Sequence, residues 1–183
     1  MVENKTVVNA ASAKADATLL QVNSLLLPVT DTVLLVPQLA VAEVLSSSDL
    51  EVGDLHLDET AVSPHYYGWI RWRDQNVPLL SFDSIYKGQR PSLNEDLKVV
   101  ICNAVFKAAA SGFYALVVSG FPRAMRLSVE SEMELEGSPS DQDGVQMLVS
   151  IDGEEALIPD FELIEQIVSD IAEQKLTKVG ESC

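Results

Sequence analysis

The sequence of 183 residues predicts an all-β fold with one helix near its C-terminal end. Short apolar runs are separated by Pro, Gly, Asp and Asn at intervals of about 8–12 residues, a spacing typical of strands and turns in a β-barrel or β-sandwich. Only residues 160–176 carry apolar side chains at helical spacing over several turns. The chain is long enough to bury a core without disulfides, as one domain or as two small subdomains that share a core.

The first part of the chain predicts a leader, a hairpin and a long loop. Residues 1–18 have no sustained apolar period, so we expect a disordered leader. Residues 25–36 predict two strands about a turn at Thr30-Asp31. The run LAVAEVL at 39–45 is too short to distinguish a strand from a helical turn. Residues 46–67 are polar and predict a loop with room for one short strand.

The segment GWIRWR alternates between the two faces of a predicted strand. Trp69, Arg71 and Arg73 fall on one face. Ile70 and Trp72 fall on the other. Because a face with two arginines cannot be core, the buried face is that of Ile70 and Trp72.

Further strands are expected in the middle of the chain. Residues 74–76 supply a turn, and residues 77–82 return as the second strand of a hairpin. Residues 97–106 are almost continuously apolar, which predicts a strand buried on both faces. We expect two more strands at 113–119 and 122–129.

The last part predicts an acidic loop, a second hairpin and the helix. Residues 130–144 are acidic and loop-like, whereas residues 145–151 alternate as a strand does. Asp152-Gly153 predicts a two-residue hairpin turn, because a type I′ turn needs positive φ at both central positions. Residues 160–176 predict a helix with an apolar stripe, and residues 175–183 predict a flexible tail.

Composition and charge exclude several classes of partner. The formal net charge of -16 disfavours nucleic acid or an anionic membrane, because both are bound through clustered Lys and Arg. We expect no direct membrane insertion, since no apolar run approaches the roughly 18–20 residues that cross a bilayer. The first residues do not resemble a secretory signal, and the cysteines, Cys102 in an apolar run and Cys183 at the end, indicate no disulfide. These features predict a cytoplasmic protein with Cys102 in its core.

No pattern in the sequence predicts catalysis or a metal site. His56 and His65 lack the spacing of a zinc site, and no Cys pair accompanies them. Motifs for a nucleophilic serine, a phosphate-binding loop and a dinucleotide fold are absent. We therefore expect no catalytic residue, cofactor or metal, and no enzyme activity.

The concentration of two tryptophans and two arginines within residues 69–73 indicates a protein-binding surface. Trp and Arg anchor interfaces because they combine a large contact area with directed hydrogen bonds. An ordinary strand, with Ile70 and Trp72 buried and the arginines solvated, explains the same residues. The residues alone leave both interpretations open.

The same hairpin resembles the central motif of CheW-like domains, in which Gly precedes a short strand, Arg closes it and a Pro-containing strand follows. These elements are Gly68, Arg73 and Val77-Pro78. Upstream, VLLVPQLAVAEVL is similar to the family's strand that ends near Glu43. Downstream, FYALVVSGFPRAMRL and VQMLVSIDGEEALIPDFELI are similar to its later strands, closing hairpin and helix. The segment GWIRWRDQNVPLLSF most resembles the ChpC-type adaptors of type IV pilus chemosensory systems.

The sequence departs from the family pattern in two places. The Gly that usually follows the motif Arg is Asp74. The position after the Pro-containing strand, where the family usually has Asp, is Ser81 in this sequence, and the nearest Asp is Asp83, two residues later. These differences bear on the shape of the turn and on the fit to a receptor.

The resemblance implies a fold and a role. It implies two intertwined five-stranded, SH3-like β-barrel subdomains over residues 19–174, with a short C-terminal helix. It also implies an adaptor that couples chemoreceptors (methyl-accepting proteins) to a CheA-type histidine kinase, in signalling for type IV pilus twitching motility. The expected partners are the kinase and the cytoplasmic tip of the receptor.

Five residues are expected at the protein-binding site. Arg71 and Arg73 would make charge-assisted contacts, and Trp69 would supply apolar contact area. Glu43 and Asp83 would be nearby acidic partners. Two alternatives stay open: a small β-barrel enzyme or ligand-binding module, which would need a pocket with convergent polar groups, and an inhibitory adaptor of the same family.

Overall fold

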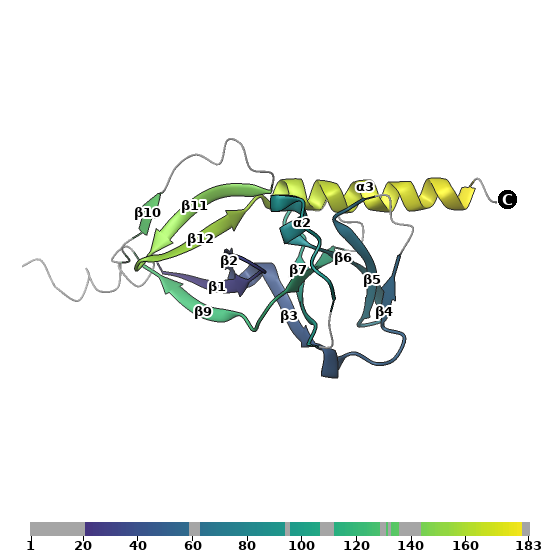
Figure 1. Cartoon of the computed structure of the whole chain (residues 1–183), viewed down its shortest axis with the longest axis horizontal. Helices are drawn as coiled ribbons and strands as arrows, with labels where there is room; N and C mark the ends of the chain where they lie inside the picture. Colours follow the sequence, from purple (N-terminus) through teal and green to yellow (C-terminus); the bar gives the residue numbers. More distant parts are fainter. Residues whose placement is uncertain are drawn as a thin grey trace, which may run out of the picture.

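The computed structural model describes residues 21–58, 63–93, 96–106, 112–128, 131, 133–135 and 144–180. In this part of the chain, twelve strands form two six-stranded sheets, accompanied by two α-helices (Figure 1). The strands are β1 (Val22–Pro28), β2 (Val33–Pro37), β3 (Val41–Ser46), β4 (Leu55–Leu57), β5 (Tyr66–Trp72), β6 (Gln75–Leu80), β7 (Lys98–Asn103), β8 (Phe113–Val118), β9 (Arg123–Leu127), β10 (Met133–Leu135), β11 (Val145–Ile151) and β12 (Glu154–Pro159). The helices are α2 (Phe82–Lys87) and α3 (Phe161–Gly180), and the short 3-10 turns are η1 (Gln38–Ala40) and η2 (Ser47–Asp49).

The two sheets differ in how the chain builds them. Sheet A has the strand order β10-β11-β12-β2-β1-β9, and sheet B has the order β3-β7-β8-β6-β5-β4. Every strand of sheet B lies between β2 and β9 in the sequence, so sheet B is an insertion into sheet A. Figure 1 shows the sheets side by side, with sheet A on the left and sheet B on the right. Each sheet thus has one strand more than the expected five.

Alternating side chains divide the core into three hydrophobic clusters. In β7, Val100 and Cys102 face a cluster shared by both sheets, whereas Val99 and Ile101 face a cluster within sheet B. A third cluster, around Val149, lies within sheet A. These four side chains are at most 2% exposed, which confirms Cys102 in the core and a strand buried on both faces at 99–102. The strand predicted at 97–106 ends at Asn103, however, and Val105 and Phe106 beyond it are more than half exposed.

Helix α3 covers the shared cluster. Its buried side chains Ile164, Val168 and Ile171 pack there, as the apolar stripe predicts. Figure 1 shows the helix running from the end of β12 along sheet B. The helix predicted at 160–176 is therefore confirmed, and it continues to Gly180.

Glu165 fixes helix α3 to the chain that follows β7. Its carboxylate is fully buried and accepts the backbone N–H of Val105 at 2.5 Å and that of Phe106 at 2.9 Å. Hydrogen bonds to a charged acceptor are stronger than neutral ones, which offsets the cost of burying the carboxylate.

The β5–β6 hairpin turns through two residues. Trp72 pairs with Gln75, and Arg73 and Asp74 between them have positive φ values of 47° and 60°. Positive φ at both central positions is the mark of a type I′ turn. The prediction of a turn at 74–76 is therefore wrong, because β6 already begins at Gln75.

Gly68 permits the close approach of β4 to β5. Its φ is +148°, and a Cβ at this position would lie 1.9 Å from the carbonyl oxygen of His56. No side chain fits there without moving β4 away. The strand pairing of β4 therefore depends on this glycine.

Helix α2 replaces the end of a predicted strand. The strand expected at 77–82 stops at Leu80. The Ser81 hydroxyl then accepts the N–H of Ser84 at 3.1 Å and caps the helix, which ends at Gly88 with φ 66°. The apolar sequence continues from β6 into α2, so hydrophobicity alone does not show where the strand ends and the helix begins.

The structure also describes the two other predicted hairpins, the apolar run at 39–45 and the two polar regions. The first hairpin and the Asp152-Gly153 hairpin are confirmed as β1–β2 and β11–β12. The run at 39–45 is a 3-10 turn followed by β3, and the long polar loop contains the short strand β4. The acidic region at 130–144, predicted as a loop, contains the short strand β10, which pairs with β11.

Some expectations fall outside the described residues, including the leader at 1–18 and positions 181–183 of the predicted tail, with Cys183. Within the residues that the structure describes, no helix has the length and apolar content to cross a bilayer. In the same part of the chain, no group of His, Cys, Asp and Glu side chains is placed to hold a metal ion.

Candidate functional site

A groove of about 530 Å³, here called the hairpin groove, lies beside the tip of the β5–β6 hairpin. It collects residues from β3, from the segment after β3 and from the hairpin. The lining residues are Glu43, Leu45, Asp49, Leu50, Glu51, Asp54, Arg71, Trp72, Arg73 and Asp74. Three of the five predicted site residues, Glu43, Arg71 and Arg73, are among them.

Glu43 joins β3 to the hairpin. Its Oε2 accepts the indole N–H of Trp72 at 2.9 Å and a guanidinium N–H of Arg73 at 3.0 Å. Strands β3 and β5 are separated by three other strands in sheet B, so this contact requires the sheet to curl back on itself. The groove exists because of that curvature.

Arg73 is held on two sides. Its guanidinium lies 4.5 Å from the centre of the Trp72 ring, in addition to its ion pair with Glu43. The Arg73 side chain is nevertheless 66% exposed. It is therefore ordered and still able to contact a partner.

Arg71 is paired with the other residue of the turn. Its guanidinium lies 3.2 Å from the Asp74 carboxylate, and the two side chains are 60% and 93% exposed. Each arginine of the groove thus has one acidic partner within the same groove.

The segment after β3 supplies further carboxylates. Asp49 accepts both the backbone N–H and the hydroxyl of Ser46, at 2.7 and 2.6 Å, in a capping box at the start of η2. Both hydrogen bonds lower the pKa of Asp49 below its usual value, and the one from the Ser46 hydroxyl has the larger effect. Asp54 accepts the backbone N–H of Glu51 at 2.7 Å. These contacts order the acidic wall of the groove.

Trp69 lies outside the hairpin groove. It stacks on His56 of β4, with ring centres 3.8 Å apart and an angle of 16° between the ring planes. On the neighbouring strand β6, Trp69 pairs with Pro78. Trp69 is half-buried by these neighbours, so it contributes a flat aromatic face on the outer side of β5, where the alternation placed it.

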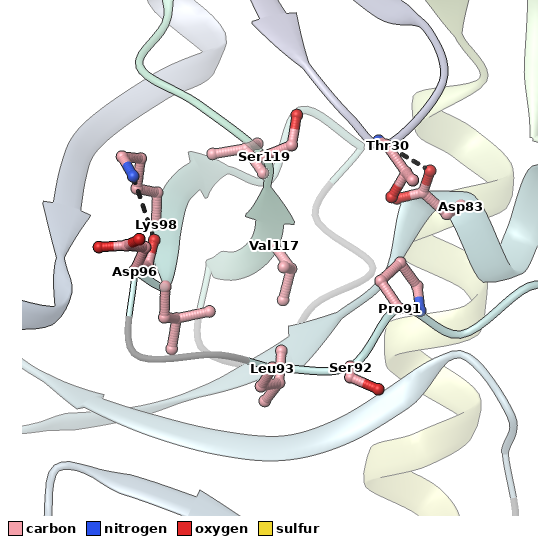
Figure 2. Close-up of a pocket in the computed structure, with 11 residues that line it drawn as sticks. Thr30, Asp83, Pro91, Ser92, Leu93, Asp96, Lys98, Val117 and Ser119 are labelled. Atoms are coloured by element: carbon pink, nitrogen blue, oxygen red, sulfur yellow. Dashed lines mark hydrogen bonds between the residues drawn. The ribbon is translucent and has the colours of Figure 1, made fainter.

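Asp83 is not brought to the arginines of the hairpin. It lies in the first turn of α2, is only 7% exposed, and accepts the backbone N–H of Thr30 at 3.0 Å. It lines a second cavity of about 310 Å³, between the β1–β2 turn, α2 and the ends of β7 and β8 (Figure 2). Figure 2 shows Asp83 and Thr30 on one side of this cavity, opposite Asp96 and Lys98.

Sequence reasoning missed part of the groove. Trp72 was expected only as a core residue, yet its N–H fixes Glu43. Asp74 was assigned to the turn alone, and the acidic wall at 49–54 was assigned to a loop. The Ser46–Asp49 capping pattern was visible in the sequence, but nothing local shows that this segment faces a hairpin some twenty residues further along.

Comparison with known proteins identifies a family for this chain. A family model for the CheW-like domain matches residues 23–168. Among solved structures, the fold is similar to that of the scaffolding protein TtCheW from Thermoanaerobacter tengcongensis, with a TM-score of 0.57 and 13% identity. That similarity covers 76% of this chain and 88% of the other, and at such low identity it shows the fold alone. No curated protein matches the sequence.

The family match extends from β1 into helix α3, and it therefore includes every strand of both sheets and the whole hairpin groove. The chain belongs to the CheW-like domain family.

Proposed function

We propose that the protein is a chemosensory adaptor that acts by binding and has no catalytic step of its own. Its partners would be the cytoplasmic tip of a chemoreceptor and the regulatory domain of a CheA-type histidine kinase. Membership in the CheW-like family and the likeness in fold to a CheW scaffolding protein support this proposal. In this role the adaptor works in the cytoplasm, because both partner surfaces are there.

The observation that carries the proposal is the ordered arginine pair in the hairpin groove. Arg71 and Arg73 are well exposed, yet each is held by a carboxylate, and Arg73 also rests on the Trp72 ring. An arginine that is already ordered loses less side-chain entropy on binding. Its remaining N–H groups can donate to carbonyl or carboxylate oxygens of a partner.

The other predicted site residues take different parts in this proposal. Glu43 orients Trp72 and Arg73, and Trp69 adds apolar contact area on the adjacent outer face of β5. Asp83 fixes the β1–β2 turn against α2 and reaches a partner only at the second cavity.

We also propose a cellular setting for the adaptor. The segment GWIRWRDQNVPLLSF resembles ChpC-type adaptors, so the output would be twitching motility driven by type IV pili. Deleting the gene should then abolish twitching without removing the pili. Normal twitching in the deletion strain would contradict this setting and leave the adaptor role to be tested in another chemosensory system.

The first prediction concerns the arginine pair. The double variant Arg71→Ala/Arg73→Ala should lose the saturable micromolar binding that we expect for the kinase regulatory domain, measured by titration calorimetry. Its thermal midpoint should stay close to that of the wild type, because both ion pairs are exposed and contribute little to stability.

A matched control is available on sheet A. The variant Arg123→Ala/Arg126→Ala also removes two exposed arginines, but from β9, outside the groove. It should bind the kinase domain as the wild type does. Equal loss in both variants would indicate a general charge effect, and no binding of the wild type to the kinase domain or any receptor tip would contradict the adaptor proposal.

Reconstitution with receptor and kinase separates an adaptor from an inhibitor of the same family. A coupling adaptor should raise receptor-controlled kinase output at intermediate ratios of adaptor to kinase. A fall in output at every ratio would instead indicate an inhibitory adaptor.

A further inference from the structure

Asp74 occupies a backbone position that glycine would adopt at lower cost. Its φ of 60° lies in the left-handed region, which L-residues with a Cβ visit only at a cost in free energy, although Asp and Asn pay less than most. The neighbouring Arg73 is also left-handed, with φ 47°. A turn with glycine at one of these two positions would have a lower free energy, but this hairpin has a side chain at both.

The Asp74 side chain is directed to solvent and to the groove. It is 93% exposed, lines the hairpin groove, and pairs with Arg71 at 3.2 Å. A pair this exposed adds little to stability. The stability of the fold therefore does not explain the presence of the Asp74 carboxylate. Its negative charge acts instead on molecules that approach the groove.

The charge of the groove follows from its lining. Five carboxylates, those of Glu43, Asp49, Glu51, Asp54 and Asp74, face two guanidinium groups. Both arginines are already paired inside the groove, which leaves the wall at 49–54 without a cationic side chain among the lining residues. The whole chain has a net charge of -16, so the long-range field has the same sign as the groove.

We propose that Asp74 is a specificity-determining residue of the hairpin groove, which selects a basic patch on the kinase regulatory domain. This inference rests on the proposed adaptor function and adds to it the charge of the partner surface. Arg71 and Arg73 supply short-range donors to the partner, whereas Asp74 completes the negative rim of the groove, which attracts the partner from a distance.

The two kinds of contact act on different rate constants. An exposed charge at the rim of an interface changes mainly the association rate, and salt screens its effect. Directed contacts in the centre of an interface change mainly the dissociation rate. Asp74 and the arginine pair should therefore be distinguishable by kinetics.

The test uses Asp74→Asn in the full chain. Asn tolerates left-handed backbone as Asp does and keeps the side-chain volume, so the variant removes the charge and retains the turn. The matched control is Asp152→Asn, which removes a charge from the left-handed position of the β11–β12 turn on sheet A (φ 52°). Association and dissociation rates are measured with the kinase regulatory domain at about 0.1 M and about 1 M salt, where the screening length falls from about 10 Å to about 3 Å.

We expect Asp74→Asn to lower the association rate about two- to fivefold at low salt, the range for one exposed charge pair. The difference should disappear at high salt, and the dissociation rate should not change. Asp152→Asn should behave as the wild type, and Arg71→Ala/Arg73→Ala should raise the dissociation rate.

Three results would overturn the inference. An unchanged association rate would show that the rim charge has no influence, and a faster one would show that the partner surface is acidic. An equal effect of Asp152→Asn would assign the change to net charge alone. If the wild type binds no kinase domain, the adaptor proposal itself fails, whereas binding by the wild type with an unaffected Asp74→Asn removes only the inference.

Discussion

Glu43 illustrates how a single residue supports both the fold and the candidate site. One of its oxygens accepts from the nearly buried Trp72 indole and from the exposed Arg73 guanidinium. The first contact belongs to the core of sheet B, and the second orders the groove. Variants of Glu43 therefore affect stability, which separates them from variants of the arginines.

Replacing Glu43 with Ala should lower the free energy of unfolding by about 1–3 kcal/mol, because the Trp72 N–H would lose its acceptor in a buried setting. Glu43→Gln keeps an acceptor oxygen and should lose less. Urea unfolding followed by tryptophan fluorescence measures both. A Glu43→Ala variant as stable as the wild type would show that water replaces the carboxylate at the indole.

The sequence predicts residues of this kind only in part. The alternation in GWIRWR was enough to separate Trp72 in the core from Arg71 at the surface, because strand geometry alone fixes the face. It could not show that Glu43, 29 residues earlier, would reach Trp72, since that contact depends on the curl of the whole sheet. The separation of Asp83 from the arginines was not predictable for a different reason, because a capped helix begins at Phe82, where the expected strand would have ended.

Among the elements, helix α3 is joined to the rest of the fold by packing and by one buried carboxylate. The apolar stripe of the helix was readable from the sequence because its spacing is local. The role of Glu165 was not, because a glutamate in an amphipathic helix is usually solvated. In the structure it points inward and binds two backbone amides after β7.

Glu165→Ala should lower the free energy of unfolding by about 2–3 kcal/mol, since two partly buried amides would lose a charged acceptor. Amide hydrogen exchange at Val105 and Phe106 should accelerate more than exchange in sheet A. The control Glu162→Ala removes an exposed glutamate from the same helix and should change stability by less than about 0.5 kcal/mol. Equal effects of the two variants would assign the loss to helix charge and not to the buried contact.

Turns show a second limit of sequence reasoning at this scale. The Asp152-Gly153 turn was predicted because its residues favour left-handed backbone. The Arg73-Asp74 turn has the same geometry, but arginine gives no such signal. In this turn the Arg73 side chain contacts Glu43 and the Trp72 ring, which are partners that the local sequence does not reveal.

At the scale of the whole molecule, the shared core contains groups that resist ionisation. Burial raises the pKa of the Cys102 thiol from 9.0 to about 12. Burial, with the charge of Asp58, raises the pKa of Tyr66 from 10.0 to about 12, and burial raises that of Tyr114 well above 10.0. These groups keep their protons in the folded chain at pH values where the unfolded chain releases them.

The fold should therefore lose stability in alkali. The contribution of these groups is complete below pH 9 and declines as pH rises from about 9 towards 12, by about 1.4 kcal/mol per pH unit for each proton released only on unfolding. Urea unfolding at a series of pH values measures the decline. Cys102→Ala should reduce the slope that begins near pH 9, and a stability independent of pH up to 11 would contradict the prediction.

The insertion of sheet B into sheet A determines the order in which the molecule can be completed during its synthesis. All strands of sheet B have left the ribosome once Val118 has emerged, but β1 must wait for β9, and β2 must wait for β12. Until helix α3 follows, the part of the shared core that Ile164, Val168 and Ile171 fill stays open, although the β1–β2 hairpin and α2 already pack against sheet B there. A nascent chain paused between β8 and β9 would therefore expose the apolar side chains against which α3 packs, the kind of surface that chaperones bind.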